Sequence, residues 1–271
     1  MTELKVRLGP SVQPRMCLHH VTDICTMSRI TAKERTMNPR HSAIVELVNQ
    51  QGRISVVALS ESVGVSEVTI RQDLTYLEGH GFLKRIHGAA VKVDSDDPDH
   101  RVWVNNKIKM DLAEKAASLV SPGETVLVEG GSANALLAKL LGERGDTAIV
   151  TSSSYIAHQL RQANSEVILL GGQYQATSES LVGPLTRLCI QHVHFSKAFI
   201  GVDGFHVDTG FTNRNMMRAD VANTILAKGQ ENIIITDSSK FGRVHPGAIG
   251  PLGKISHVIT DSGLPEQDAA W

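Results

Sequence analysis

The segment Val65-Ser66-Glu67-Val68-Thr69-Ile70-Arg71-Gln72-Asp73-Leu74 sets the architecture of the first part of this chain. Ser66 is a typical N-cap residue, because its hydroxyl accepts a hydrogen bond from a backbone N–H that the first helical turn leaves unsatisfied. Ile70, Leu74 and Leu77 then recur at helical spacing and form an apolar stripe. The segment therefore predicts a helix that starts after Ser66 and buries one face.

The opposite face of this predicted helix carries side chains that suit the major groove of DNA. Arg71 can bind a guanine edge through two hydrogen bonds, and Glu67 can accept one from a cytosine amine. Val68 is apolar yet points outward, which suits a thymine methyl group. A solvated helix face is the alternative interpretation, since mixed polar faces are common on surface helices. The candidate DNA-binding residues of this helix are Ser66, Glu67, Val68, Thr69, Arg71 and Gln72.

Two shorter signals predict helices upstream. Asn38 followed by Pro39 is a favourable helix start, because Asn caps an orphan N–H and Pro has none to leave unpaired. That helix should run to about Gln51, with Gly52 closing it. Residues 56–63 place apolar side chains at the spacing of a second helix.

A basic hairpin is predicted downstream of the reading helix. Residues 82–91 alternate between apolar and polar around a turn that contains Gly88. Lys84, Arg85 and His87 bring positive charge beside the helix, where they can contact phosphates without reading sequence. Three helices followed by a basic hairpin predict a winged helix-turn-helix.

These motifs carry a family resemblance. Val65 to Leu74 resembles the signature of the DeoR family of bacterial sugar-metabolism regulators, and His87-Gly88-Ala89-Ala90 resembles that family's His-Gly-Gly-Ala. Ala89 in place of the second Gly predicts either a turn that does not need positive φ there or a slightly altered wing tip. The resemblance implies a DNA-binding transcriptional regulator, a repressor of a sugar or carbohydrate operon, whose DNA-binding domain spans residues 37–93.

The composition of the whole chain limits the classes of protein to which it can belong. The chain has 271 residues, 41% of them hydrophobic and 20% charged, which is ordinary for a globular protein of two domains. The formal charge of −1 means that nucleic-acid binding must rest on a local patch. Three scattered cysteines fit a reducing cytoplasm, and no apolar run reaches bilayer length.

The N-terminal segment, residues 1–36, shows no periodicity and is predicted to be a disordered extension. Met37 stands directly before the first helix signal and is a candidate start of translation. We expect neither a metal nor a cofactor, because no spacing typical of a zinc finger or ribbon links the residues that look superficially metal-like, Cys17, His19, His20 and Cys25.

The second part of the chain is predicted to be an α/β domain. Residues 94–104 are acidic and contain Pro98, so we place a linker there. A helix over residues 105–120 opens a domain that spans residues 105–271. Short apolar runs then alternate with helices, which predicts an open, mainly parallel sheet that binds ligands at the carboxyl ends of its strands. The predicted strands cover residues 125–128, 148–151, 167–170, 197–202, 233–236 and 258–260.

Small and polar residues follow several of these strands. Gly and Ser turns before helices direct backbone N–H groups at an anion such as phosphate, although tight turns need the same residues for structural reasons. Lys240 is a candidate phosphate contact and Asp203 a candidate partner of sugar hydroxyls, with a solvated loop charge and a turn residue as the respective alternatives. The candidate effector residues are Gly130, Gly131, Ser132, Asn134, Ser152, Ser153, Gly171, Gly172, Asp203, Gly204 and Lys240.

The same family resemblance extends over this half and spans residues 38 to 262. It implies a sensor domain similar in fold to ribose-5-phosphate isomerase that binds phosphorylated sugars or related metabolites. The family usually carries a further element after Asp261, whereas this chain ends at Trp271, which predicts an incomplete sheet edge. The motifs that carry this part are Leu169-Leu170-Gly171-Gly172, Leu181-Val182-Gly183-Pro184, Gly201-Val202-Asp203-Gly204 and Asp237-Ser238-Ser239-Lys240-Phe241-Gly242.

Three functions compete at this point. A ligand-controlled regulator would act as a homo-oligomer that presents paired reading helices to repeated half-sites. A sugar-phosphate isomerase-like enzyme with an accessory winged helix would need a carboxylate base, for which Glu129, Asp203 and Asp220 are the candidates. A winged helix used for protein contacts would bind no DNA. The first interpretation, without enzymatic activity, is the one favoured by the motifs.

Overall fold

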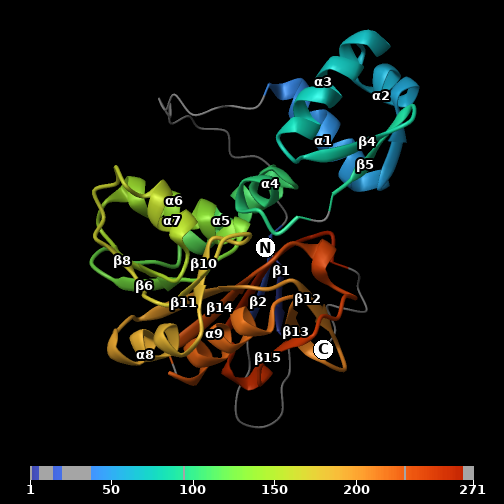
Figure 1. The fold of residues 1–271 in the computed structure, drawn as a ribbon. Coiled ribbons are helices and arrows are strands. Elements are labelled where there is room, and N and C mark those ends of the chain that lie inside the picture. Colours follow the sequence, from blue (N-terminus) through green and yellow to red (C-terminus); the bar gives the residue numbers. More distant parts are fainter. Residues whose placement is uncertain (1, 6–14, 20–37, 94, 229, 265–271) are drawn as a thin grey trace. The chain divides into compact units, whose positions relative to one another are not determined.

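The structure is a computed structural model that describes residues 2–5, 15–19, 38–93, 95–228 and 230–264. Its contacts divide the chain into two compact units (Figure 1). One unit comprises Thr22–Asn106, and the other comprises Met1–Val21 with Lys107–Trp271. No helix in the described ranges is long and apolar enough to cross a bilayer.

The first unit is a winged helix-turn-helix. Its helices and strands within residues 38–93 are α1 (Pro39–Gln51), β3 (Arg53–Ser55), α2 (Val56–Val63), α3 (Glu67–Gly79), β4 (Leu83–Ile86) and β5 (Ala89–Lys92). The strands form an antiparallel sheet in the order β3-β5-β4. The three helices and the hairpin are therefore confirmed, and β3 adds a strand that its three residues did not reveal in the sequence.

Caps and an apolar core explain why these elements form. The Asn38 Oδ1 atom accepts a hydrogen bond from the Arg40 N–H at 3.0 Å, and the Ser66 Oγ atom accepts one from the Thr69 N–H at 3.2 Å. The predicted stripes meet in one core, whose fully buried side chains include Ile44, Val48, Leu59, Ile70, Leu74 and Leu77.

The turn of the hairpin comprises His87 and Gly88, because Ile86 pairs with Ala89 across it. Gly88 has a φ of 66°, a conformation that favours glycine. Ala89 lies in β5 and does not adopt positive φ. The first of the two alternatives drawn from Ala89 is therefore confirmed.

Where the sequence predicts a linker, the structure forms helix α4 (Pro98–Trp103) instead. The Asp97 side chain caps it by accepting from the His100 N–H at 3.0 Å, and Pro98 occupies its first turn. The His100 Nε2 atom lies 3.1 Å from the Phe82 carbonyl oxygen, and Trp103 packs against the core of the first unit. These tertiary contacts order a segment whose composition is typical of a linker.

The second unit is built on a mainly parallel sheet. Its order is β1-β2-β16-β14-β11-β6-β7-β8. Helices lie on both of its faces, with α5 to α7 on one side and α8 and α9 on the other (Figure 1). The strands predicted from sequence are β6 (Thr125–Val128), β7 (Ala148–Thr151), β8 (Val167–Leu169), β11 (Lys197–Gly201), β14 (Glu231–Ile235) and β16 (His257–Asp261).

The remaining elements connect or cover these strands. The described helices and turns are α5 (Asn106–Ala117), α6 (Ser132–Arg144), α7 (Ser154–Gln159), α8 (Pro184–His192), α9 (Met216–Ala227), η1 (Ser238–Lys240) and η2 (Leu252–Lys254). Two small antiparallel sheets, absent from the prediction, comprise β9 (Gln173–Gln175) with β10 (Ser180–Val182), and β12 (Gly204–His206), β13 (Gly210–Asn213) and β15 (Gly247–Ile249). These strands are short and, unlike the short strands of the main sheet, are not continuous apolar runs, so the sequence does not mark them.

The strand order reverses in the middle of the sheet. From β6 the chain continues to β7 and β8 on one side, and from β11 it continues to β14 and β16 on the other. In open α/β sheets the loops diverge at such a reversal, and ligands bind outside the carboxyl ends of the two strands that flank it. The reversal therefore directs attention to the loops after β6 and β11.

Two predictions about the ends of the chain were wrong. Strands β1 (Thr2–Lys5) and β2 (Arg15–His19) form within the segment predicted to be disordered. Strand β2 pairs in parallel with β16, so the edge predicted to be incomplete has a neighbour. An unpaired strand edge offers backbone groups to a distant segment, which local periodicity does not reveal. Met37 and the rest of residues 1–36 lie outside the described residues.

Candidate nucleic-acid interface and ligand site

Helix α3 presents the polar face that the sequence predicts. Glu67, Val68, Arg71 and Gln72 all lie at its surface, and the Val68 side chain is 63% exposed. The Arg71 Nη2 atom donates to the Glu67 Oε2 atom at 2.6 Å, one turn away. The Arg71 guanidinium is therefore paired with an exposed carboxylate, which a base edge would have to replace. Ser66 and Thr69 bond to each other at the cap, so they help to shape the helix start.

A buried carboxylate ties α3 to the start of α1. Asp73 is 6% exposed, and it accepts hydrogen bonds from the Arg40 Nε atom at 2.7 Å and the Arg40 Nη2 atom at 3.0 Å. The His41 Nε2 atom lies 2.9 Å from its Oδ1 atom. Burial raises the pKa of Asp73, but the bonds to Arg40 and His41 outweigh it and leave the pKa below its ordinary value. This anchor was not predicted from the sequence.

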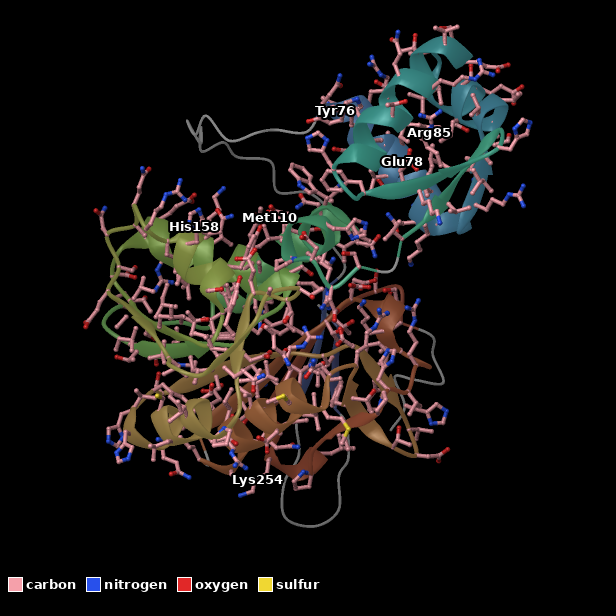
Figure 2. All side chains as sticks on the ribbon, in the orientation of Figure 1. Tyr76, Glu78, Arg85, Met110, His158 and Lys254 are labelled. Carbon is pink, nitrogen blue, oxygen red and sulfur yellow. The ribbon has the colours of Figure 1, made fainter. Side chains whose placement is uncertain are left out.

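The wing shows two kinds of basic side chain. Lys84 and His87 are exposed on the strand and turn of the hairpin. Arg85, which is labelled with Glu78 in Figure 2, is exposed as well but is bonded to α3. Its Nη1 atom donates to the Thr75 Oγ1 atom at 2.5 Å, and its backbone N–H donates to the Glu78 Oε1 atom at 2.7 Å. The predicted phosphate contacts therefore do not share one environment.

In the second unit, the loops after β6 and β11 touch through their backbones. The Gly201 N–H donates to the Glu129 Oε2 atom at 3.0 Å. A Cβ atom on Gly201 would approach the Gly130 carbonyl oxygen to 2.7 Å, and one on Gly131 would lie 3.6 Å from the Gly201 Cα atom. Only glycine allows this approach. The loops predicted to bind an anion thus meet at the point of strand reversal.

Asn134 joins the same two strand ends. Its Nδ2 atom donates to the carbonyl oxygens of Glu129 at 2.9 Å and Phe199 at 3.1 Å. Its Oδ1 atom is buried and accepts no hydrogen bond from the described residues. Gly131 precedes α6, and no described side chain caps that helix start. A buried acceptor and a helix start without a side-chain cap among the described residues therefore lie together, which suits a ligand that carries hydroxyls and a negative charge.

Ser152 and Ser153, which follow β7, lie near the loop after β6. Ser153 caps α7 by accepting from the Ile156 N–H at 3.3 Å, and the Leu181 N–H donates to the Ser152 carbonyl oxygen at 2.7 Å. A Cβ atom on Gly130 would lie 3.4 Å from the Ser180 Oγ atom and 3.8 Å from the Ser153 Cβ atom. The β6 and β7 loops are therefore neighbours, with Ser180 added from β10.

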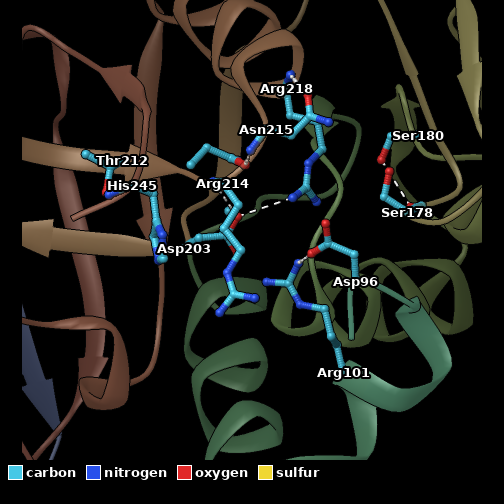
Figure 3. A network of polar contacts seen from close by, with 12 residues as sticks. Asp96, Arg101, Ser178, Ser180, Asp203, Thr212, Arg214, Asn215, Arg218 and His245 are labelled. Atoms are coloured by element: carbon cyan, nitrogen blue, oxygen red, sulfur yellow. Dashed lines mark hydrogen bonds and ion pairs between the residues drawn. The ribbon is translucent and has the colours of Figure 1, made fainter. Parts of the chain in front are cut away.

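Asp203 after β11 forms a buried ion pair. Its Oδ2 atom accepts from the Arg218 Nη2 atom at 3.2 Å and from the Arg214 N–H at 3.1 Å (Figure 3). The Asp203 and Arg218 side chains are only 3% and 8% exposed. Asn215 caps α9 by accepting from the Met217 and Arg218 N–H groups, which aims the start of that helix at the β11 loop.

A second cluster of charged residues comprises Asp237 and Lys240, which follow β14, and Lys109. Burial raises the pKa of Asp237, but the positive charges of Lys240 and Lys109 outweigh it and hold the pKa below its ordinary value. Lys109 is 6% exposed and occupies the buried stripe of α5 together with Leu112, Ala113 and Ala116. A lysine in such a stripe is costly unless it meets a negative charge.

Two family models match this chain, one in each unit. A DeoR-like helix-turn-helix domain matches residues 40–96, and a DeoR C terminal sensor domain matches residues 104–262. The chain belongs to the DeoR family. The lactose phosphotransferase system repressor of Streptococcus mutans is 32% identical over 232 residues, which cover 82% of this chain and 91% of that protein. The L-fucose operon activator of Haemophilus influenzae is 28% identical, covering 85% and 94%.

Among solved structures, a ribose 5-phosphate isomerase A from Methanocaldococcus jannaschii is similar over 51% of this chain and 55% of that chain. The TM-score is 0.39 and the sequence identity 18%. The DeoR family assignment rests on the sequence matches, and it makes this chain a DNA-binding transcriptional regulator.

Some predicted effector residues of this DeoR-family sensor domain serve packing. A Cβ atom on Gly172 would lie 1.9 Å from the Thr186 Oγ1 atom, and one on Gly204 would lie 2.5 Å from the Arg243 carbonyl oxygen. Thr186 also donates to the Gly171 carbonyl oxygen at 2.9 Å. Gly172 therefore allows the close approach of α8, and Gly204 that of the Arg243 backbone to β12.

Other residues of the site were missed. Lys109 could have been noticed as a basic residue at an apolar position of its helix. Arg218 also lies within a buried helix face, beside Ala219 and Ala222. A charge at an apolar position is the available signal for both. Ser180 carried no signal beyond its residue type, and Gly201 belonged to a quoted motif without being named as a site residue, because the contacts of both come from distant segments.

Proposed function

We propose that this DeoR-family chain represses a bacterial sugar or carbohydrate operon in the cytoplasm and is released by a phosphorylated sugar or related metabolite. The α3 face would read the operator while Lys84 and His87 contact phosphates. A homo-oligomer would present two such helices to repeated half-sites. The ligand must favour one conformational state by binding it more tightly than the other.

The observation that carries the effector half is the reversal of strand order between β6 and β11. The residues proposed to hold the ligand are Gly130, Gly131, Ser132 and Asn134 after β6, Ser152 and Ser153 after β7, and Lys240 after β14. The phosphate would lie at the start of α6, and the Asn134 Oδ1 atom would accept from a sugar hydroxyl. Asp203 would order the β11 loop through Arg218.

The experiment that tests this function is selection of bound fragments from the organism's own genome by the purified full chain. The enriched fragments should share one motif with repeated half-sites, and sugar phosphates should lower their affinity. Enrichment without a shared motif would refute sequence-specific control. Turnover of aldose phosphates by the same preparation would favour the isomerase-like alternative, in which Glu129 or Asp203 is the base. Asp220 suits that role less, since it is 45% exposed and pairs with Arg187.

Arg71→Ala should weaken binding to the selected operator by about 1 to 3 kcal/mol, the usual value of a two-bond contact with guanine. Binding to an unrelated duplex should change much less. Lys84→Ala is the matched control, because loss of a phosphate contact weakens both duplexes and lowers the salt slope by about 0.9. Equal losses on both duplexes for Arg71→Ala would assign Arg71 to phosphate contact instead.

Lys240→Ala should weaken the response to a sugar phosphate by at least about tenfold in ligand concentration, because a charged hydrogen bond to phosphate is lost. Operator affinity without ligand should stay within about twofold. The measurement is release of labelled operator against the concentration of each compound. Lys254→Ala, which changes a lysine of η2, is the control. Normal release by Lys240→Ala would remove Lys240 from the site.

A further inference from the structure

Arg85 differs from the other basic residues of the wing in the side of the strand that it occupies. Successive side chains of a strand point to opposite faces. In β4, Leu83 is buried in the core of the first unit, so Arg85 lies on the same side as Leu83, toward α3. Lys84 lies on the other side of the strand, and both side chains are exposed, so the two differ in the face that they occupy and not in exposure. The two neighbouring cations therefore face different surroundings.

Besides its pairing with Ala90 in the hairpin, Arg85 makes two hydrogen bonds to the second half of α3. Its guanidinium donates to the Thr75 Oγ1 atom and its backbone N–H donates to the Glu78 Oε1 atom. The Thr75 hydroxyl donates a hydrogen bond to the Arg71 carbonyl oxygen at 2.8 Å. The Thr75 oxygen is thus left to accept, which is the role that Arg85 requires. A chain of hydrogen bonds runs from the backbone of Arg71 to the wing.

We propose that Arg85 is a positioning residue, which fastens the wing to the reading helix through Thr75 and Glu78. The wing and α3 then bind DNA as one rigid unit. The angle between the β4–β5 hairpin and α3 is therefore fixed before binding. Preorganisation of this kind raises affinity because less conformational freedom is lost on binding. The phosphate contacts of the wing belong to Lys84 and His87.

The test measures operator affinity of the full chain over a series of salt concentrations. Thr75→Val removes the acceptor while keeping the shape of the side chain and the charge of Arg85. Thr75→Val and Arg85→Ala should each weaken binding about threefold to tenfold, the usual value of one or two net hydrogen bonds. The double variant should be no weaker than either single variant, since both remove the same link.

The salt dependence separates positioning from phosphate contact. Lys84→Ala should lower the salt slope by about 0.9, whereas Thr75→Val should leave it unchanged and Arg85→Ala should change it by less than half as much as Lys84→Ala does. Glu78→Gln, which keeps an acceptor for the Arg85 N–H, should bind nearly as the parent does, and Glu78→Ala should not. The proposal is overturned if Arg85→Ala lowers the slope as much as Lys84→Ala and its effect adds to that of Thr75→Val.

Discussion

Arg218→Ala is expected to destabilise the sensor domain by about 3 to 5 kcal/mol, the range found when one partner of a buried ion pair is removed. The Asp203 side chain is 3% exposed, and its carboxylate would lose the guanidinium that bonds to it and keep the hydrogen bond from the Arg214 N–H. Few side-chain changes outside the apolar core cost as much. The measurement is hydrogen exchange of the full chain, followed at the amides of β11 and α9, because two units need not unfold in one step.

Arg187→Ala provides the matched control. Arg187 pairs with Asp220 at 3.5 Å, but these side chains are 46% and 45% exposed. Exposed pairs contribute about 0 to 1 kcal/mol, so exchange in α9 should be almost unchanged. A loss below about 1 kcal/mol for Arg218→Ala as well would mean that solvent or neighbouring groups compensate Asp203 fully. The pair would then have no role in ordering the β11 loop.

The first unit shows how far local signals reach. Asn38, Ser66 and the apolar stripes predict where α1 and α3 begin, because a cap and a helical repeat involve residues that are close in sequence. The turn at Gly88 is equally local. Sequence could therefore place the reading face of α3, which requires only the direction of each side chain on a helix.

The residues that sequence could not place are those whose partners are distant. Asp73 bonds to Arg40 across 33 residues, and its position in a buried stripe shows that something must compensate its charge without showing what. Lys109 and Asp237 are even farther apart in sequence, so their interaction could not be predicted either. The pairing depends on topology, which no local pattern contains.

The glycines after the strands illustrate a different limit. Gly131 and Gly172 look alike in sequence, since both follow a strand and precede a helical or extended segment. In the structure the first lies against the β11 loop, whereas the second makes room for Thr186. A glycine signals that something approaches closely, and only the fold shows whether that is a ligand loop or a helix.

Asp73→Ala is expected to destabilise the DNA-binding unit by about 2 to 3 kcal/mol, since it removes hydrogen bonds between charged groups that are largely buried. The Arg40 side chain is 33% exposed and can be partly hydrated, which keeps the cost below that of the Arg218 change. In a Trp271→Phe background, Trp103 is the remaining tryptophan of the two. Because Trp103 packs against the core of this unit, its fluorescence during urea unfolding measures the loss.

The effect should also depend on pH in a defined direction. The folded-state pKa of Asp73 lies below its ordinary value, so its stabilisation is present above the unfolded-state pKa of about 3.9 and is lost as pH falls through the folded-state value. The difference in unfolding free energy between parent and Asp73→Asn should therefore be largest at neutral pH and shrink below about pH 4. Glu67→Ala, which removes an exposed carboxylate from the same helix, should change stability by less than about 0.5 kcal/mol at neutral pH. A difference for Asp73→Asn that stays constant from pH 7 to pH 3 would show that the second acceptor oxygen of Asp73, and not its charge, holds α1 against α3.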